Sequence, residues 1–158
     1  MNGKQCKLCV TAVTVQNSSR AHSGKILNSG WYKCNVDAAF HSEVGKTTAG
    51  WCIRDYLGRF VLAGSSWIQG RCAVIEGEAV AVLEAIEELS HRGFRKVIFE
   101  TDSKIVDDAV HSIHDDVSEF SFIIRNIKCI LSLHSDFEVK STNEHGCSGY
   151  CKGGHFMT

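Results

Sequence analysis

The chain lacks a surplus of charge of either sign. Its 158 residues contain 17 Lys and Arg and 18 Asp and Glu, which gives a net charge of −1. This balance argues against a general nucleic-acid coat protein, because such a protein holds nucleic acid in a broad basic field. An enzyme that acts on nucleic acid is still compatible with the composition, provided that it uses a local basic patch or metal ions that bridge to phosphates.

Long apolar runs are also missing. No apolar stretch approaches the roughly 20 residues that a membrane-spanning helix needs, and the first residues lack the apolar core of a secretory signal peptide. We therefore expect an intracellular protein without membrane contact, in the nucleus or in the cytoplasm, with its eight cysteines reduced. The cysteines are scattered through predicted strands and both ends of the chain, which argues against a disulfide framework.

The remaining composition is that of one globular domain. Apolar residues make up 44% of the chain and charged residues 22%, and this length suffices for one full core but not for two. Residues 1–30 are rich in Ser, Asn, Gly and Lys without a sustained period, so we expect a flexible leader. The predicted domain covers residues 31–140, and residues 141–158 form an irregular tail rich in Gly, Cys and His.

The hydrophobic periods within the domain predict eight elements. Three period-2 segments with short connections predict an antiparallel meander, and helical spacing of apolar residues then predicts the first helix. We expect strands over 31–41, 47–55, 59–67, 94–101 and 136–140, and helices over 74–91, 103–114 and 118–133. This βββαβααβ order predicts an α/β fold with a mixed five-stranded sheet flanked by helices, in which the first and fourth strands are parallel neighbours.

Three carboxylates stand where such a fold would bring them together. Asp37 interrupts the first strand, Glu78 opens the first helical run, and Asp102 ends the fourth strand. An acid inside or just beyond an apolar strand costs desolvation energy unless something positive compensates it. Mg²⁺ and Mn²⁺ prefer hard oxygen ligands, and two such ions can clamp the attacking and leaving oxygens of a phosphodiester. The three acids therefore indicate a two-metal site, and one buried ion pair with two solvated acids is the alternative.

The segments around these acids resemble the ribonuclease H-like domain of plant non-LTR retroelements. The resemblance covers residues 31–140 and rests on four motifs in order: CNVDAAF at 34–40, GWCIRD at 50–55, EGEA at 76–79 and ETDS at 100–103. It implies a ribonuclease H-like fold and metal-dependent hydrolysis of the RNA strand of an RNA–DNA hybrid, with two Mg²⁺ or Mn²⁺ ions. The family's catalytic, metal-binding acids carry over onto Asp37, Glu78 and Asp102.

Two site residues have competing interpretations. Glu76 lies two residues before Glu78 and points in a different direction from the helix start; the run after Glu78 matches the family better, so we place the ligand at Glu78. Ser103 is either a contact to a 2′-hydroxyl of the RNA strand, as the resemblance implies, or a helix cap. The expected partner is an RNA–DNA hybrid, and the expected oligomeric state is a monomer.

The tail departs from the family pattern. Family members close the site with a C-terminal helix that brings a fourth Asp, or another residue in many plant copies, whereas no Asp follows Asp136 here. We hypothesise a frameshift, since another reading frame of the tail can encode a helix-forming string; sequencing the genomic locus tests this. The predicted function is an endoribonuclease impaired in this copy. The alternative is a catalytically inactive nucleic-acid-binding or interaction domain derived from a retroelement.

Overall fold

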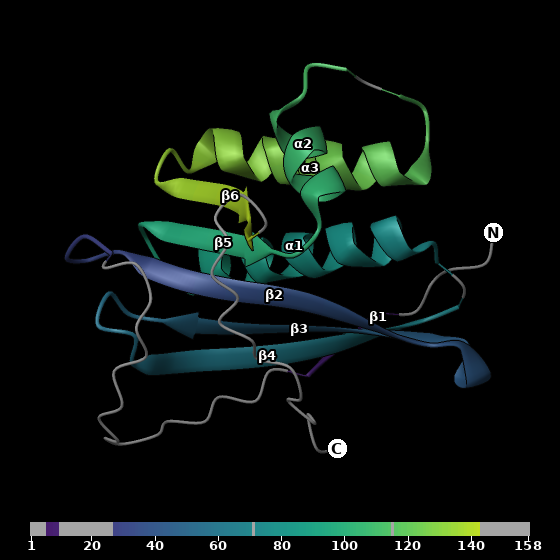
Figure 1. Cartoon of the computed structure of the whole chain (residues 1–158), viewed down its shortest axis with the longest axis horizontal. Helices are drawn as coiled ribbons and strands as arrows, with labels where there is room; N and C mark the ends of the chain where they lie inside the picture. The colour runs from purple at the N-terminus through teal and green to yellow at the C-terminus, as the bar shows by residue number, and fades with distance from the viewer. Residues whose placement is uncertain (1–5, 10–26, 71, 115, 143–158) are drawn as a thin grey trace.

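A computed structural model describes residues 6–9, 27–70, 72–114 and 116–142, and these residues form six strands and three α-helices (Figure 1). A short 3-10 turn, Ser42–Val44, connects β2 to β3. In chain order the elements are β1 Cys6–Cys9, β2 Tyr32–His41, β3 Lys46–Arg54, β4 Phe60–Gln69, α1 Val74–His91, β5 Val97–Thr101, α2 Lys104–His111, α3 Glu119–Leu133 and β6 Phe137–Ser141.

The strands form one mixed sheet in the order β1-β4-β3-β2-β5-β6. β2, β3 and β4 are the predicted antiparallel meander, and β5 pairs in parallel with both β2 and β6. The predicted α/β class and mixed sheet are confirmed, including the parallel pairing of the first and fourth predicted strands. β1 adds a sixth strand at the edge of β4. It lies within the predicted leader, where its four residues are too few to establish a period.

The core lies between the sheet and α1. Alternate residues of β3 are buried, and Trp51 is its largest fully buried side chain. Gly64 on the neighbouring strand is required by this packing, because a Cβ there would lie 2.3 Å from the Trp51 ring. The inward face of α1 supplies small and aliphatic side chains that are completely buried: Ala79, Ala81, Val82, Ala85, Ile86 and Leu89. The helical period thus predicted the buried face of α1 correctly.

The end of β5 creates the opening in which the candidate site lies. The last paired residues of β2 and β5 are Val36 and Thr101. β2 continues for five more residues, but β5 stops and the chain turns into α2. Asp37 and Asp102 therefore follow directly on the last pair, side by side, where β2 no longer has a parallel neighbour. α1 packs on one face of the sheet against β2 and β5, so the first turns of α1 lie at this opening.

Several predictions fall on residues whose structure is not described. These are most of the leader, at residues 1–5 and 10–26, and the tail from residue 143, where the missing C-terminal helix and the frameshift were predicted. The domain limits therefore stay predictions. Among the described residues, no helix combines the length and the apolarity that crossing a membrane requires.

Candidate metal centre

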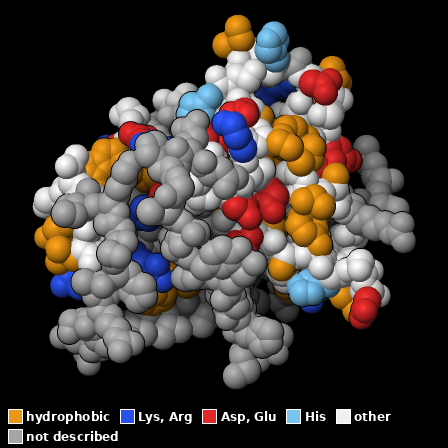
Figure 2. Space-filling view, in the orientation of Figure 1, with side chains coloured by type: hydrophobic (Ala, Val, Ile, Leu, Met, Phe, Trp, Pro, Cys, Tyr) orange, Lys and Arg blue, Asp and Glu red, His pale blue; other side chains and the backbone are white. Residues whose placement is uncertain are grey.

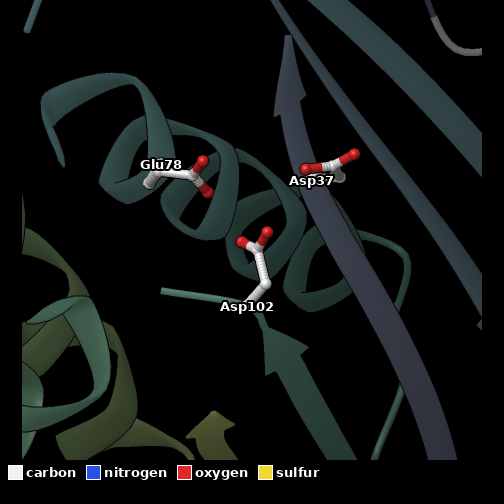
Figure 3. A group of neighbouring side chains, drawn as sticks. All are labelled: Asp37, Glu78 and Asp102. Atoms are coloured by element: carbon white, nitrogen blue, oxygen red, sulfur yellow. The ribbon is translucent and has the colours of Figure 1, made fainter. Parts of the chain in front are cut away.

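Asp37, Glu78 and Asp102 converge on one point, as the sequence predicted. Each offers a carboxylate oxygen that lies within 4.8 Å of the oxygens offered by the other two. Figure 3 shows the three side chains pointing toward one another from β2, α1 and the residue after β5. Asp and Glu side chains also gather near the centre of the face shown in Figure 2. Asp37 and Asp102 are exposed and Glu78 is half-buried, so the cluster opens to solvent on one side.

Asp37 is oriented by the backbone. The amide of Ala38 donates a hydrogen bond of 2.9 Å to Asp37 Oδ1. Partial burial, followed by repulsion from Asp102, raises the pKa of the Asp37 carboxyl, and the bond from Ala38 partly offsets this rise. The carboxylate is thus held in place at the cost of a less favourable ionised form.

Glu78 carries the strongest sign of an incomplete site. Its burial, together with repulsion from Asp102 and then Asp37, raises its pKa from 4.5 to about 7. Its Oε2 atom is buried and accepts no hydrogen bond from the described residues. A buried carboxylate oxygen without a donor is costly unless a cation or another donor reaches it. The local electrostatics therefore call for positive charge at this point.

Glu76, the rival of Glu78, has a different role. Its Oε2 accepts a hydrogen bond of 3.1 Å from the amide of Ala73, the residue that precedes α1. A carboxylate that satisfies a free amide at a helix N-terminus is a capping interaction, and the helix dipole favours its negative charge there. The assignment of the cluster position to Glu78 rather than Glu76 agrees with this geometry.

Ser103 is the N-cap of α2. Its Oγ accepts a hydrogen bond of 3.4 Å from the amide of Val106, and its own amide donates to Thr101 Oγ1 at 3.2 Å. The helix-cap interpretation is therefore correct for this structure. A contact between Ser103 and an RNA strand stays a prediction. The cap fixes the first turn of α2 directly after Asp102, so it also fixes the backbone from which that acid projects.

Asp107 is a structural acid close to the site that the sequence analysis missed. It is buried on α2, where Oδ2 accepts a 2.9 Å hydrogen bond from the amide of Ser141 and Oδ1 lies 3.0 Å from His111 Nδ1. It ties the last residue of β6 to α2, next to Thr101, the final residue of β5. The signal was present in the sequence, because Asp107 falls on the same helix face as Val106 and Val110, both buried.

The donor set suits a hard divalent cation. Carboxylate oxygens from three elements converge, and the buried Glu78 Oε2 still has its acceptor capacity available. Mg²⁺ and Mn²⁺ favour oxygen ligands of this kind and usually retain several waters, so three protein carboxylates suffice for a partly hydrated site. The residues present therefore fit a magnesium or manganese centre.

Comparison with protein families shows which family the domain belongs to. A family model described as reverse transcriptase-like matches residues 35–143, which include all three acids. The chain belongs to the reverse transcriptase-like family. No curated protein sequence matches it.

Solved structures show the same fold at low sequence identity. Ribonuclease H1 from the archaeon Halobacterium salinarum superposes with a TM-score of 0.61 at 20% identity, covering 71% of this chain and 85% of that one. LC11 ribonuclease H1, isolated from compost and solved with an RNA/DNA hybrid, gives 0.60 at 16% identity, covering 70% and 83%. The prototype foamy virus protease–reverse transcriptase gives 0.57 at 14% identity, covering 85% of this chain and 20% of that one. The domain therefore has the ribonuclease H fold.

Proposed function

We propose that the protein is a metal-dependent endoribonuclease that hydrolyses the RNA strand of RNA–DNA hybrids. The observation that carries the proposal is the convergence of three carboxylates around a buried, unpartnered oxygen of Glu78. The ribonuclease H fold and the published hybrid complex of a structural neighbour support the choice of substrate. The motifs around the acids further support an origin in a plant non-LTR retroelement.

Asp37, Glu78 and Asp102 would hold two Mg²⁺ or Mn²⁺ ions. When bound, such ions activate a water molecule and neutralise the charge that develops on a phosphodiester. Glu78 contributes from the half-buried side, and its pKa, raised to about 7 by burial and by its acidic neighbours, falls again when positive charge arrives. Asp37 and Asp102 are exposed, so a scissile phosphate can approach between them.

Selection of RNA over DNA requires a group that senses the 2′-hydroxyl. Ser103 is our candidate, because it directly follows Asp102 and is only half-buried. Its Oγ already accepts one hydrogen bond, from Val106. A hydroxyl has two acceptor lone pairs and one donor proton, so Ser103 retains the capacity for a second bond.

The test is cleavage of one hybrid labelled on either strand. We would incubate it with the protein in Mg²⁺ or Mn²⁺, beside Asp102→Asn and the matched control Asp108→Asn. Asp108 is an exposed acid on α2, paired with Lys104 at 3.2 Å and outside the cluster. We expect cuts in the RNA strand alone, which disappear with Asp102→Asn and persist with Asp108→Asn.

One observation favours a second function, a nucleic-acid-binding domain without turnover. Residues 137–158 contain no Asp, and the family resemblance places a fourth acid in that part of the domain. Hybrid binding without cleavage, by a sample whose folding is verified by circular dichroism, would select this alternative. Cleavage that survives Asp102→Asn would instead identify a contaminating nuclease and refute the proposal.

A further inference from the structure

A second charged feature lies at the opposite end of β2 and β5 from the carboxylates. It is a hollow of about 340 Å³ between the start of β2 and the connection from α1 to β5. Both strands begin at the left of Figure 1, whereas the acids lie beyond the end of β5. The residues that line the hollow are Gly30, Tyr32, Arg92, Gly93, Phe94 and Arg95.

Each of the two arginines that line the hollow forms an ion pair with a carboxylate through its Nε atom. Arg92 Nε lies 2.7 Å from Glu88 Oε1, and Arg95 Nε lies 2.8 Å from an oxygen of Asp136. A guanidinium group has five N–H donors in a fixed planar fork. Each ion pair uses one nitrogen of its guanidinium group, so the terminal amino groups remain available. This is the arrangement that suits bidentate binding of a phosphate.

The backbone beside the hollow is held in an uncommon conformation. Lys96 has a backbone φ angle of 56°, which residues other than glycine rarely adopt. Its amide donates to Asp136 at 3.0 Å, and its carbonyl accepts from the amide of Tyr32 at 2.8 Å. The Lys96 ammonium lies near Gly30, 3.9 Å from the position that a Cβ there would occupy. A third cationic side chain, that of Lys96, therefore lies at the border of the hollow.

The local charge is positive although the chain as a whole is slightly negative. Arg92, Arg95 and Lys96 supply three cations, and the two acids that contact them, Glu88 and Asp136, leave a local surplus of one positive charge. Tyr32 and Phe94 form the aromatic wall, with ring centroids 5.2 Å apart at 86°. A hollow with paired arginines, a nearby lysine and an aromatic wall suits a phosphate of a nucleic-acid strand.

We propose that this hollow binds a backbone phosphate of the hybrid, away from the cleavage point. The inference rests on the proposed function for the identity of the strand. Tyr32 and Asp37 are five residues apart on β2, which corresponds to roughly 17 Å along a strand. The hollow therefore lies about this distance along β2 from the carboxylate cluster, and a phosphate bound there is separate from the scissile one.

The first test measures how salt weakens binding to a fluorescent 18-base-pair hybrid in EDTA, where cleavage cannot interfere. Arg92→Gln and Arg95→Gln are compared with Arg125→Gln. Arg125 is an exposed arginine on α3 that contacts the Phe122 ring and lies outside the hollow. We expect either hollow variant to reduce the slope of log K against log salt by about 0.9, equivalent to roughly eightfold weaker binding at 0.1 M salt than a 1 M reference predicts. Arg125→Gln should leave the slope unchanged.

The second test uses inorganic phosphate and needs no nucleic acid. Millimolar phosphate should shift the backbone amide resonances of Gly93, Phe94 and Arg95, and Arg95→Gln should abolish those shifts. The spectra of the variants also show directly whether each remains folded. This measurement separates a general anion site from a site that requires a nucleic-acid strand.

The outcomes separate the two proposals. Hybrid binding with the wild-type slope in both hollow variants would overturn the phosphate site and leave the proposed nuclease intact. Phosphate-induced shifts in a protein that binds no hybrid in EDTA would overturn the strand as the ligand of the hollow. No shift and no hybrid binding in EDTA would refute the phosphate site, and the cleavage test in Mg²⁺ decides the proposed function separately.

Discussion

The carboxylates at the two ends of β5 have different surroundings, and their pKa values shift in opposite directions. Beside the start of β5, Oδ2 of Asp136, the residue before β6, accepts from Arg95 Nε at 2.8 Å and from the amide of Lys96 at 3.0 Å, whereas its buried Oδ1 accepts no hydrogen bond from the described residues. The hydrogen bond from Arg95 is the main reason that the pKa of Asp136 lies below its usual value. Beyond the last residue of β5, Asp102 faces Asp37 and Glu78, and the pKa values of both those acids are raised.

Asp136 is thus stabilised by its neighbours, whereas the acids beyond β5 repel one another. Another acid on the sheet also contacts a cation and an amide donor. Glu100 contacts Lys33 at 2.9 Å and Asn35 at 3.2 Å. Like charges that the fold holds close together reduce stability, and such local conflicts are expected at functional sites. Substitutions at the paired acids and at the facing acids should therefore have different effects.

The largest expected effect is the loss of cleavage when a facing acid is neutralised. Asp37→Asn should lower hybrid cleavage by more than about a hundredfold, because even the outer partners of metal ligands contribute 10–100-fold. Glu100→Gln, which neutralises a paired acid on β5, should change the rate only a few-fold. Initial rates in Mg²⁺ compare the two variants, and equal losses would remove the distinction.

The next effect concerns a buried, paired acid. Asp107→Ala leaves the amide of Ser141 without its acceptor, so we expect the free energy of unfolding to fall by about 2–3 kcal/mol. Asp108→Ala, at the exposed neighbouring position, should cost less than about 0.5 kcal/mol. Urea unfolding measures both. A destabilisation of similar size in the two variants would contradict the role given to Asp107.

A smaller effect, with the opposite sign, is expected at Glu78. Its pKa of about 7 in the folded protein exceeds the ordinary value of 4.5 that it takes when unfolded. The folded state therefore binds more protons between these values, and metal-free protein should lose stability as the pH rises from about 4.5 to about 7. Because Glu78 is half-buried, we expect only about 1 kcal/mol, or a Tm decrease of about 2–4 °C.

Glu78→Gln should remove most of that decrease, since glutamine does not titrate. Thermal unfolding of both proteins in EDTA at pH 5 and pH 8 makes the comparison. At pH 8 the variant should be the more stable of the two. A wild-type Tm that rises over this interval while that of the variant stays flat would reverse the predicted sign.

The smallest effect is expected at the paired end. The Arg95 side chain is 72% exposed, and ion pairs of this kind contribute about 0–1 kcal/mol. Arg95→Gln should therefore lower the free energy of unfolding by roughly 0.5 kcal/mol, while its effect on hybrid binding is much more visible. A loss above about 2 kcal/mol in urea unfolding would show that Arg95 is primarily structural.

Much of the fold could be predicted because the hydrophobic period of each strand or helix is contained in its own short segment of sequence. The helix over 74–91 has the predicted limits, and the meander strands differ from the prediction by one or two residues at their ends. β1 could not be predicted, because its pairing with β4 is a long-range contact that a four-residue segment does not encode. The start of β5 was placed too early, at residue 94 instead of Val97. Phe94 packs on Tyr32 and extended the apolar run.

The three acids could be predicted because each interrupts or ends an apolar period, and the topology then brings them together. The sequence offered a helix cap as one of two roles of Ser103, and the structure shows that cap. The capping role of Glu76 was visible only once the start of α1 was known. The hollow at the other end combines residues from β2 and from the connection that follows α1. Its arginines resemble ordinary surface charge in the sequence, so only their arrangement in space sets them apart.

The most direct measurement is paramagnetic broadening by Mn²⁺ in the absence of nucleic acid. Substoichiometric Mn²⁺ added to isotope-labelled protein should broaden the amide resonances of Asp37, Glu78 and Asp102 first, and Asp102→Asn should weaken that effect strongly. Amides near the paired Asp136 should remain sharp at the same concentration. Broadening that spreads equally over all exposed acids, or that is unchanged in the variant, would contradict a metal centre at the end of β5.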